Sequence, residues 1–287
     1  MRGIALILAA SLFFSCADTG QKWLTAAMSP FEAVWLRYSV FTVLAVGLAY
    51  ARGGRILKTR QLPLQITRGL SMVAAACSFT WALYYLPVAE ATAINFVFPL
   101  FITGLSIMFL KERISLGQLL ATLVGLAGVL MIVQPGSAAF QPAALLPVLT
   151  AAVWAGGVVI TRYMSAGERP ETTLAYSALV GMIVLTAVQP FVWRTPTVVE
   201  LLIGVATGIA STVGHWLFVL AFRNAAASTL APFTYSQIVW ATGLGYLVFG
   251  NLPGVSTFIG GTIIVAAGLY VANGHRHKKT DGLSPPV

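Results

Sequence analysis

Charge is what this sequence has least of. Only 9% of its 287 residues are Asp, Glu, Lys or Arg, whereas 58% are hydrophobic and the mean hydropathy is +0.86. A soluble domain carries roughly a quarter of its residues as charged groups. The composition therefore excludes a water-soluble globular domain and predicts a chain that lies in a lipid bilayer.

Cysteine is equally scarce, because Cys16 and Cys77 are the only two and both lie inside apolar stretches. This excludes a disulfide framework and a CxxC metal site. The sequence also contains no Gly-Lys-Ser/Thr phosphate loop, no metal-ligand cluster and no nucleophile–base set. We therefore expect no enzyme activity, no cofactor and no metal. The net charge of +9 follows no basic stripe, so nucleic acid is not an expected partner.

Long apolar runs dominate what remains. A bilayer core about 30 Å thick needs about 20 helical residues to cross it. Polar, Pro and Gly breaks divide the chain into ten such runs, which predicts an all-α membrane protein. The predicted spans are 3–22, 30–50, 64–86, 88–110, 115–134, 141–163, 171–190, 197–221, 226–249 and 254–273.

Basic residues predict the orientation of these spans, because Lys and Arg collect in short cytoplasmic loops. With the N-terminus inside, all but three of the 17 basic residues fall on the cytoplasmic side. The exceptions are Lys22 and Arg194 outside and Arg37 within a span. We therefore predict a multi-pass protein of the inner (cytoplasmic) membrane with both termini in the cytoplasm. Residues 276–287 are predicted to form a disordered tail.

Two segments with the same internal order recur about 139 residues apart. Thr103-Gly104-Leu105 in the first corresponds to Thr242-Gly243-Leu244 in the second. The repeat divides the chain into halves, 1–136 and 137–275. Because five spans per half is an odd number, the second half crosses the membrane in the opposite sense. Inverted repeats of this kind are typical of carriers that open alternately to the two sides.

A second set of segments extends over essentially the whole chain: 85–94, 99–101, 110–115, Gly125, Gly128, 226–233, 235–237, 248–250 and 260–268. These segments resemble EamA-type members of the drug/metabolite transporter superfamily. The resemblance implies a ten-helix secondary transporter with a central cavity. The chain departs from the family at Gly250-Asn251, where Gly-Glu is usual.

A narrower resemblance lies in residues 171–181, 190–193, 214–215 and 237–242. These segments are similar to the branch that includes riboflavin, S-adenosylmethionine and opine-metallophore transporters. Members of this branch transport different substrates, so the resemblance does not identify the substrate of this protein.

Few ionisable residues fall inside the spans, and each is a functional hypothesis because its burial in lipid is costly. Arg37 is able to bind a carboxylate or phosphate with both guanidinium arms. Asp18, Glu90 and His215 are candidates for proton coupling or for an ion pair. The alternatives are a static Asp18–Arg37 pair, an Asp18 contact with Lys22 one turn along its own helix, and a packing role for His215.

Two prolines near mid-span predict helix kinks, Pro99 in the fourth span and Pro232 in the ninth. Interrupted helices of carriers often lie at the substrate site near the midplane. Asn95, Tyr235 and Gln237 lie around these kinks and are able to hydrogen-bond a polar solute.

Trp154 and Trp240 are predicted near the midplane, where an indole needs a partner for its N–H or a wet cavity. Both are candidate walls of a substrate site, and ordinary helix packing is the alternative.

The sequence thus predicts a secondary transporter of a small polar or aromatic metabolite, such as a riboflavin-, amino-acid-, S-adenosylmethionine- or opine-like compound. A membrane-embedded enzyme or a scaffold subunit is the alternative. Substrate, direction, coupling ion and homodimer formation are left open.

Overall fold

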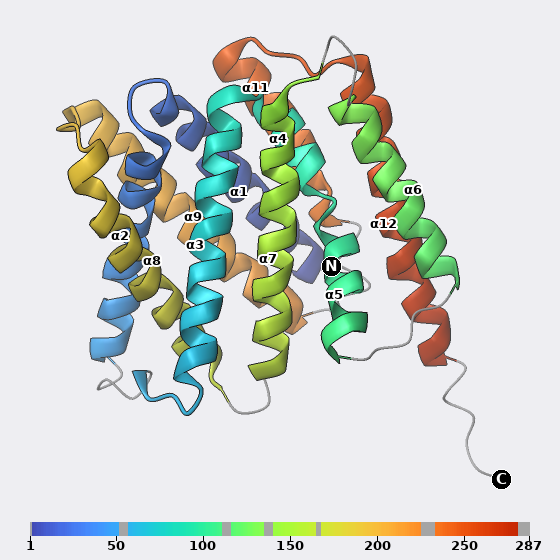
Figure 1. Cartoon of the computed structure of the whole chain (residues 1–287), viewed down its shortest axis with the longest axis horizontal. Helices are drawn as coiled ribbons and strands as arrows, with labels where there is room; N and C mark the ends of the chain where they lie inside the picture. Colours follow the sequence, from blue (N-terminus) through green and yellow to red (C-terminus); the bar gives the residue numbers. More distant parts are fainter. Residues whose placement is uncertain are drawn as a thin grey trace.

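The computed structural model describes residues 2–51, 57–110, 116–134, 140–164, 168–224 and 233–280. Within these ranges the regular structure consists of helices alone. Figure 1 shows them as a bundle of long, roughly parallel rods joined by short connections. The all-α prediction is confirmed.

The helices follow the predicted spans closely. Six of the long helical stretches are apolar enough to cross a membrane, and four shorter apolar stretches accompany them. The helices are α1 (Arg2–Thr25), α2 (Pro30–Ala51), α3 (Leu62–Tyr85), α4 (Val88–Asn95), α5 (Phe98–Leu110), α6 (Leu116–Val133), α7 (Leu145–Met164, after a 3₁₀ turn at Pro142–Ala144), α8 (Pro170–Val192), α9 (Val198–Asn224), α11 (Ser236–Phe249) and α12 (Val255–Thr280).

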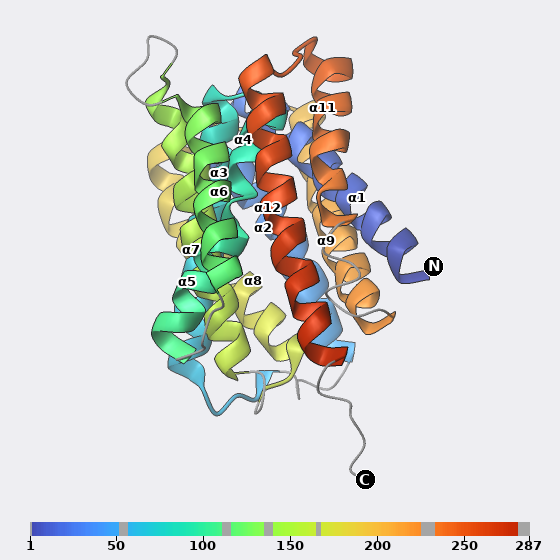
Figure 2. The same cartoon turned by 90° about the vertical axis from the view of Figure 1, so that its right-hand side faces the viewer.

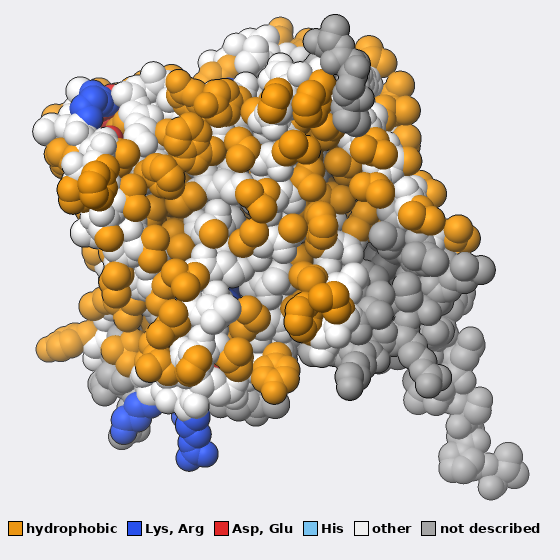
Figure 3. All heavy atoms as spheres, viewed as in Figure 1, with side chains coloured by type: hydrophobic (Ala, Val, Ile, Leu, Met, Phe, Trp, Pro, Cys, Tyr) orange, Lys and Arg blue, Asp and Glu red, His pale blue; other side chains and the backbone are white. Residues whose placement is uncertain are grey.

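The outer surface of the bundle is apolar. Large side chains such as Phe191 (86% exposed) and Leu247 (79% exposed) point away from the bundle. Hydrophobic side chains cover most of the face in Figure 3, and Lys and Arg side chains project from one end and from one corner. Such a surface requires lipid around it. The protein is therefore a multi-pass membrane protein.

Small residues bring the helices together. Helix α1 packs along α9, α3 along α7, α2 along α8, and α6 along α12 (Figures 1 and 2). Gly69 of α3 lies against Val180 of α8, and Gly208 of α9 lies against Val40 of α2. The absence of a side chain at these glycines lets the helix backbones approach closely.

One predicted span is two helices in the structure. Helix α4 ends at Asn95 and α5 begins at Phe98, with Pro99 as its second residue. Proline has no N–H to continue the helical hydrogen bonds, but it fits the first turn of a new helix. On the second half, α11 begins directly after the turn at Tyr235. Pro232 lies outside the described residues.

The last helix continues past its predicted end at residue 273 to Thr280. The predicted end of the span is the point where the apolar run stops. A helix continues beyond that point as long as its backbone hydrogen bonds are made, so the helix ends later than the apolar run. The last seven residues of the predicted tail, 281–287, lie outside the described ranges.

Glu168 fastens two connecting segments at one end of the bundle. Its carboxylate accepts hydrogen bonds from the Thr59 hydroxyl (2.7 Å), the Arg60 backbone N–H (3.1 Å) and the Gln65 amide (3.2 Å). Slight burial of the Glu168 carboxyl favours its neutral form, but these hydrogen bonds outweigh that effect and lower its pKa. The segment before α3 is thus tied to the segment before α8.

A methyl group at Gly260 is expected to destabilise the bundle. The added Cβ would lie 2.5 Å from the backbone oxygen of Gly128, so α6 and α12 would have to separate. Overpacking of this kind typically costs about 1–3 kcal/mol. Gly260→Ala should therefore lower the melting temperature in detergent. Gly243→Ala is the control, because nothing lies within 4 Å of its added Cβ; equal melting temperatures for the two variants would contradict the packing.

The Glu168 contacts predict a pH-dependent contribution to stability. A carboxyl with a lowered pKa in the folded state stabilises the fold above its unfolded pKa and loses that contribution as the pH falls through its folded pKa. Unfolding of the unsubstituted protein and of Glu168→Gln should therefore differ at neutral pH and converge below the usual carboxyl range. A difference that persists unchanged at low pH would argue against the role of the carboxylate.

Candidate substrate site

A buried carboxylate on α1 meets the first turn of α11. Asp18 is 9% exposed, and its carboxylate accepts a hydrogen bond from the side-chain amide of Gln237 at 3.3 Å. The Ser15 hydroxyl, one turn earlier on α1, donates to the backbone carbonyl of Gln237 at 3.1 Å. Two adjacent contacts therefore hold the start of α11 against α1.

Arg37 of α2 supplies the positive charge of this region. Its guanidinium interacts electrostatically with Asp18 on α1, with Cys77 on α3 and with His215 on α9. Among the contacts of the described residues, Asp18 and Arg37 do not form a direct ion pair. Two opposite charges thus attract each other, and the guanidinium donates no hydrogen bond to a described residue, although it has five N–H groups to donate.

His215 of α9 lies near Arg37. Its ring contacts Phe14 edge to face, with ring centroids 4.9 Å apart. The side chain is exposed, and the charges of Arg37 and of Arg68 on α3 act on it. His215 thus combines a ring contact with a position near two arginines.

Arg68 is a polar anchor that the sequence did not reveal, since it counted only as a cytoplasmic charge. Its Nε donates to the Thr161 hydroxyl of α7 (2.8 Å). Its Nη1 donates to the Thr173 carbonyl of α8 (3.1 Å) and to the Ser177 hydroxyl. Its position inside the predicted span, six residues after α3 begins, was the signal that could have found it.

The two helix interruptions contact each other. The rings of Phe96, just after α4, and Tyr235, just before α11, lie with centroids 5.1 Å apart. Asn95 ends α4 at this point, and its side-chain oxygen is buried with no hydrogen-bond partner among the described residues. Trp154 of α7 contacts Phe98 edge to face at 4.9 Å. These residues lie at the interruption between α4 and α5 and at the start of α11, and none of these contacts involves Asp18.

Other predicted residues stand apart from this centre. Trp240 is 38% exposed on α11, and Glu90 lies half-buried in the first turn of α4. Within the described ranges, no hydrogen bond or ring contact joins either of them to Asp18, Arg37 or His215. The structure thus brings together Asp18, Gln237, Arg37 and His215 and leaves Trp240 and Glu90 at a distance.

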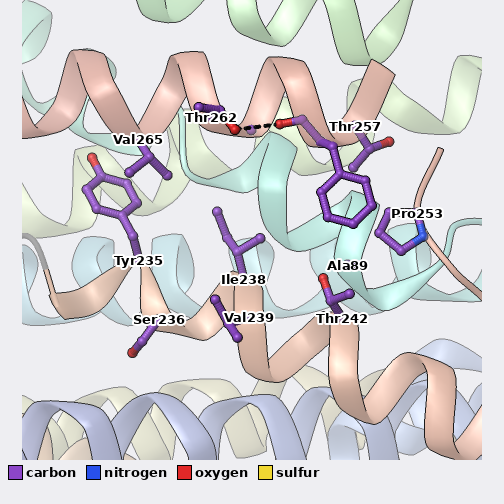
Figure 4. Close-up of a pocket in the computed structure, with 12 residues that line it drawn as sticks. Ala89, Tyr235, Ser236, Ile238, Val239, Thr242, Pro253, Thr257, Thr262 and Val265 are labelled. Atoms are coloured by element: carbon purple, nitrogen blue, oxygen red, sulfur yellow. Dashed lines mark hydrogen bonds between the residues drawn. The ribbon is translucent and has the colours of Figure 1, made fainter. Parts of the chain in front are cut away.

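A lateral cavity of about 480 Å³ lies between α11 and α12, beside Ala89 of α4. Figure 4 shows side chains of both helices, including Tyr235 and Thr242, around it. The Thr262 hydroxyl at its edge donates to the Phe258 carbonyl at 2.8 Å. Its lining is mainly apolar and contains none of the charged residues, so this cavity is distinct from the charged centre.

An apolar exterior, with a buried carboxylate and an arginine inside the bundle, defines a multi-pass membrane protein whose interior holds charged groups. The chain belongs to the EamA-like transporter family, whose model matches residues 1–134 and 141–273. This membership confirms the resemblance found in the sequence. The protein is accordingly a transporter of small metabolites and not an enzyme.

Three relatives have different cargoes in their names. An S-adenosylmethionine uptake transporter of Rickettsia bellii is 30% identical, over 94% of this chain and 92% of its own. A riboflavin transporter of Brucella anthropi is 27% identical over 92% and 96%, and the pseudopaline exporter CntI of Pseudomonas aeruginosa is 28% identical over 92% and 94%. A crystal structure at 20% identity superposes with a TM-score of 0.68 over 96% of this chain and 98% of the other, which shows the same fold.

Removal of the Arg68 guanidinium is expected to loosen the contact of α3 with α7 and α8. Hydrogen bonds to a charged group are worth about 1.5–3 kcal/mol, so Arg68→Met should lower the melting temperature clearly. Arg60→Met is the matched control, because only the backbone N–H of Arg60 takes part in a described contact. If both variants melt at the same temperature, Arg68 is not an anchor.

Proposed function

We propose that the protein is a secondary carrier that moves a small polar metabolite across the inner membrane by alternating access. The metabolite would bind between the two halves at Asp18, Arg37, His215 and Gln237. The observation that carries the proposal is the buried Asp18–Gln237 hydrogen bond beside Arg37, which forms no direct ion pair with any carboxylate of the described residues. Charged side chains inside a membrane are energetically costly, so their presence there indicates a role in binding or coupling.

Corresponding contacts in the two halves support an inverted repeat. The family model matches the chain twice, once in each half. Gly69 against Val180 and Gly208 against Val40 are the same contact displaced by 139 or 140 residues. The helix interruptions at Phe96 and Tyr235 are also 139 residues apart. Two equivalent halves are what a carrier needs to exchange its inward- and outward-open conformations.

Ten spans with both termini in the cytoplasm complete the proposal. In this arrangement, α4 and α5 together count as one span. Helix α11 and the segment that precedes it count as another. The C-terminal ends of α1, α3 and α11 then face outward, and the Glu168 cluster faces the cytoplasm. Coupling to a proton would use Asp18 or His215, which both interact with Arg37.

The cargo is proposed from the chemistry of the centre. Arg37 is suited to a carboxylate or phosphate, Asp18 to a cationic or donor group, and Gln237 to either. Tyr235, Asn95 and Trp154 at the interrupted helices would contact the less polar part of the same solute. S-adenosylmethionine, riboflavin and pseudopaline are the first compounds to test, since relatives are named for them.

Uptake into proteoliposomes tests the proposal. We expect at least one labelled compound of that panel to enter, with a rate that changes when a pH gradient is imposed. Arg37→Met and Asp18→Asn should each reduce the initial rate by about tenfold or more, because each removes a charge-assisted contact. Arg60→Gln should leave the rate unchanged. Unaltered uptake in both site variants would show that the solute binds elsewhere.

A further inference from the structure

A lysine joins three helices at their C-terminal ends. Lys22, in the last turn of α1, donates from Nζ to the carbonyl oxygens of Leu83 (2.8 Å) and Leu86 (2.7 Å). The same ammonium lies 5.8 Å from the ring centroid of Phe249, at the end of α11. The last carbonyls of α3 have no partner within their helix and carry partial negative charge, so a cation is favoured there. Lys22 thus connects α1 to α3 and α11.

Near this contact, three buried polar side chains have no hydrogen-bond partner among the described residues. Gln21 on α1, Thr80 on α3 and Thr92 on α4 are at most 1% exposed. Both amide atoms of Gln21 and the hydroxyl oxygens of both threonines have no hydrogen-bond partner among the described residues. Buried polar groups are normally paired, so three on neighbouring helices need an explanation.

The position of these groups suggests what they do. Helices α1, α3 and α4 contact one another in every pair. At about 1.5 Å per residue, Thr80 and Thr92 lie roughly 5–9 Å inward from the Leu86–Pro87 turn. Asp18 lies one turn inward from Lys22 on α1. The unpaired groups therefore lie within about two helical turns of the Lys22 contact, close to the depth of Asp18.

We propose that Lys22 is the outer gate of the carrier and that Gln21, Thr80 and Thr92 line the part of the solute path that it closes. This proposal rests on the carrier function and orientation proposed above. In the closed state, the three side chains are buried with no hydrogen-bond partner among the residues that the structure describes. When Lys22 leaves the α3 carbonyls, water and the uncharged polar groups of the solute bind these side chains. That gain offsets the lost lysine contacts, so the open and closed states stay close in free energy.

Accessibility of position 92 from outside the cell tests the gate. In a chain with Cys16→Ser and Cys77→Ser, Thr92→Cys should react slowly with a membrane-impermeant maleimide added to intact cells. Adding Lys22→Met removes the charge-assisted contacts and should speed the reaction by about tenfold or more. Lys22→Arg keeps a cation at this point and should stay slow. In Lys22→Gln, the rate of maleimide labelling should lie between those two rates. This variant replaces Lys22→Met in the test if Lys22→Met is not produced.

Asn251→Cys, in the exposed turn between α11 and α12, is the matched reference. It should react at the same rate in every Lys22 background and so reports correct folding and orientation. Unchanged Thr92→Cys labelling in Lys22→Met or Lys22→Gln, with intact Asn251→Cys labelling, would overturn the gate and leave Lys22 as a helix cap only. Labelling requires no solute, whereas absence of metabolite uptake in proteoliposomes would defeat the carrier function instead.

Discussion

A carboxylate inside a membrane-spanning bundle stays there only if protein groups replace the water it has lost. Asp18 meets this requirement through the Gln237 amide and the nearby charge of Arg37. Because Gln237 is the second residue of α11, the same contact determines where α11 meets α1. The Asp18–Gln237 hydrogen bond, with the Ser15 contact beside it, therefore links the position of α11 to the charged centre.

Composition and breaks in the apolar runs were enough to predict an all-helical membrane protein and several of its helix boundaries. Ser29-Pro30 and Leu86-Pro87 each coincide with a real helix boundary, because proline ends one helix and opens the next. The interruption beside Pro99 was predicted only as a kink. Whether a helix bends or separates depends on the neighbours that bind the freed backbone groups, and these come from distant parts of the chain.

The candidate site was predictable only in part. Asp18, Arg37 and His215 were identifiable because a charged or titratable residue inside an apolar run has a cost that sequence alone reveals. Their mutual placement was not, because it arises from contacts between helices far apart in the sequence. Lys22 and Arg68 show this most clearly: both were assigned to the membrane surfaces, yet each binds backbone or hydroxyl oxygens of other helices.

The central claim is that Asp18 and Arg37 together form the solute site, and ligand-induced stabilisation measures this directly. A compound that binds only the folded state raises the melting temperature by an amount that grows with the ratio of its concentration to its dissociation constant. Of the compounds that the purified protein transports, at least one should raise the melting temperature of the unsubstituted protein and leave that of Arg37→Met unchanged. An equal rise in both proteins would contradict the account, because the solute would then bind without the arginine.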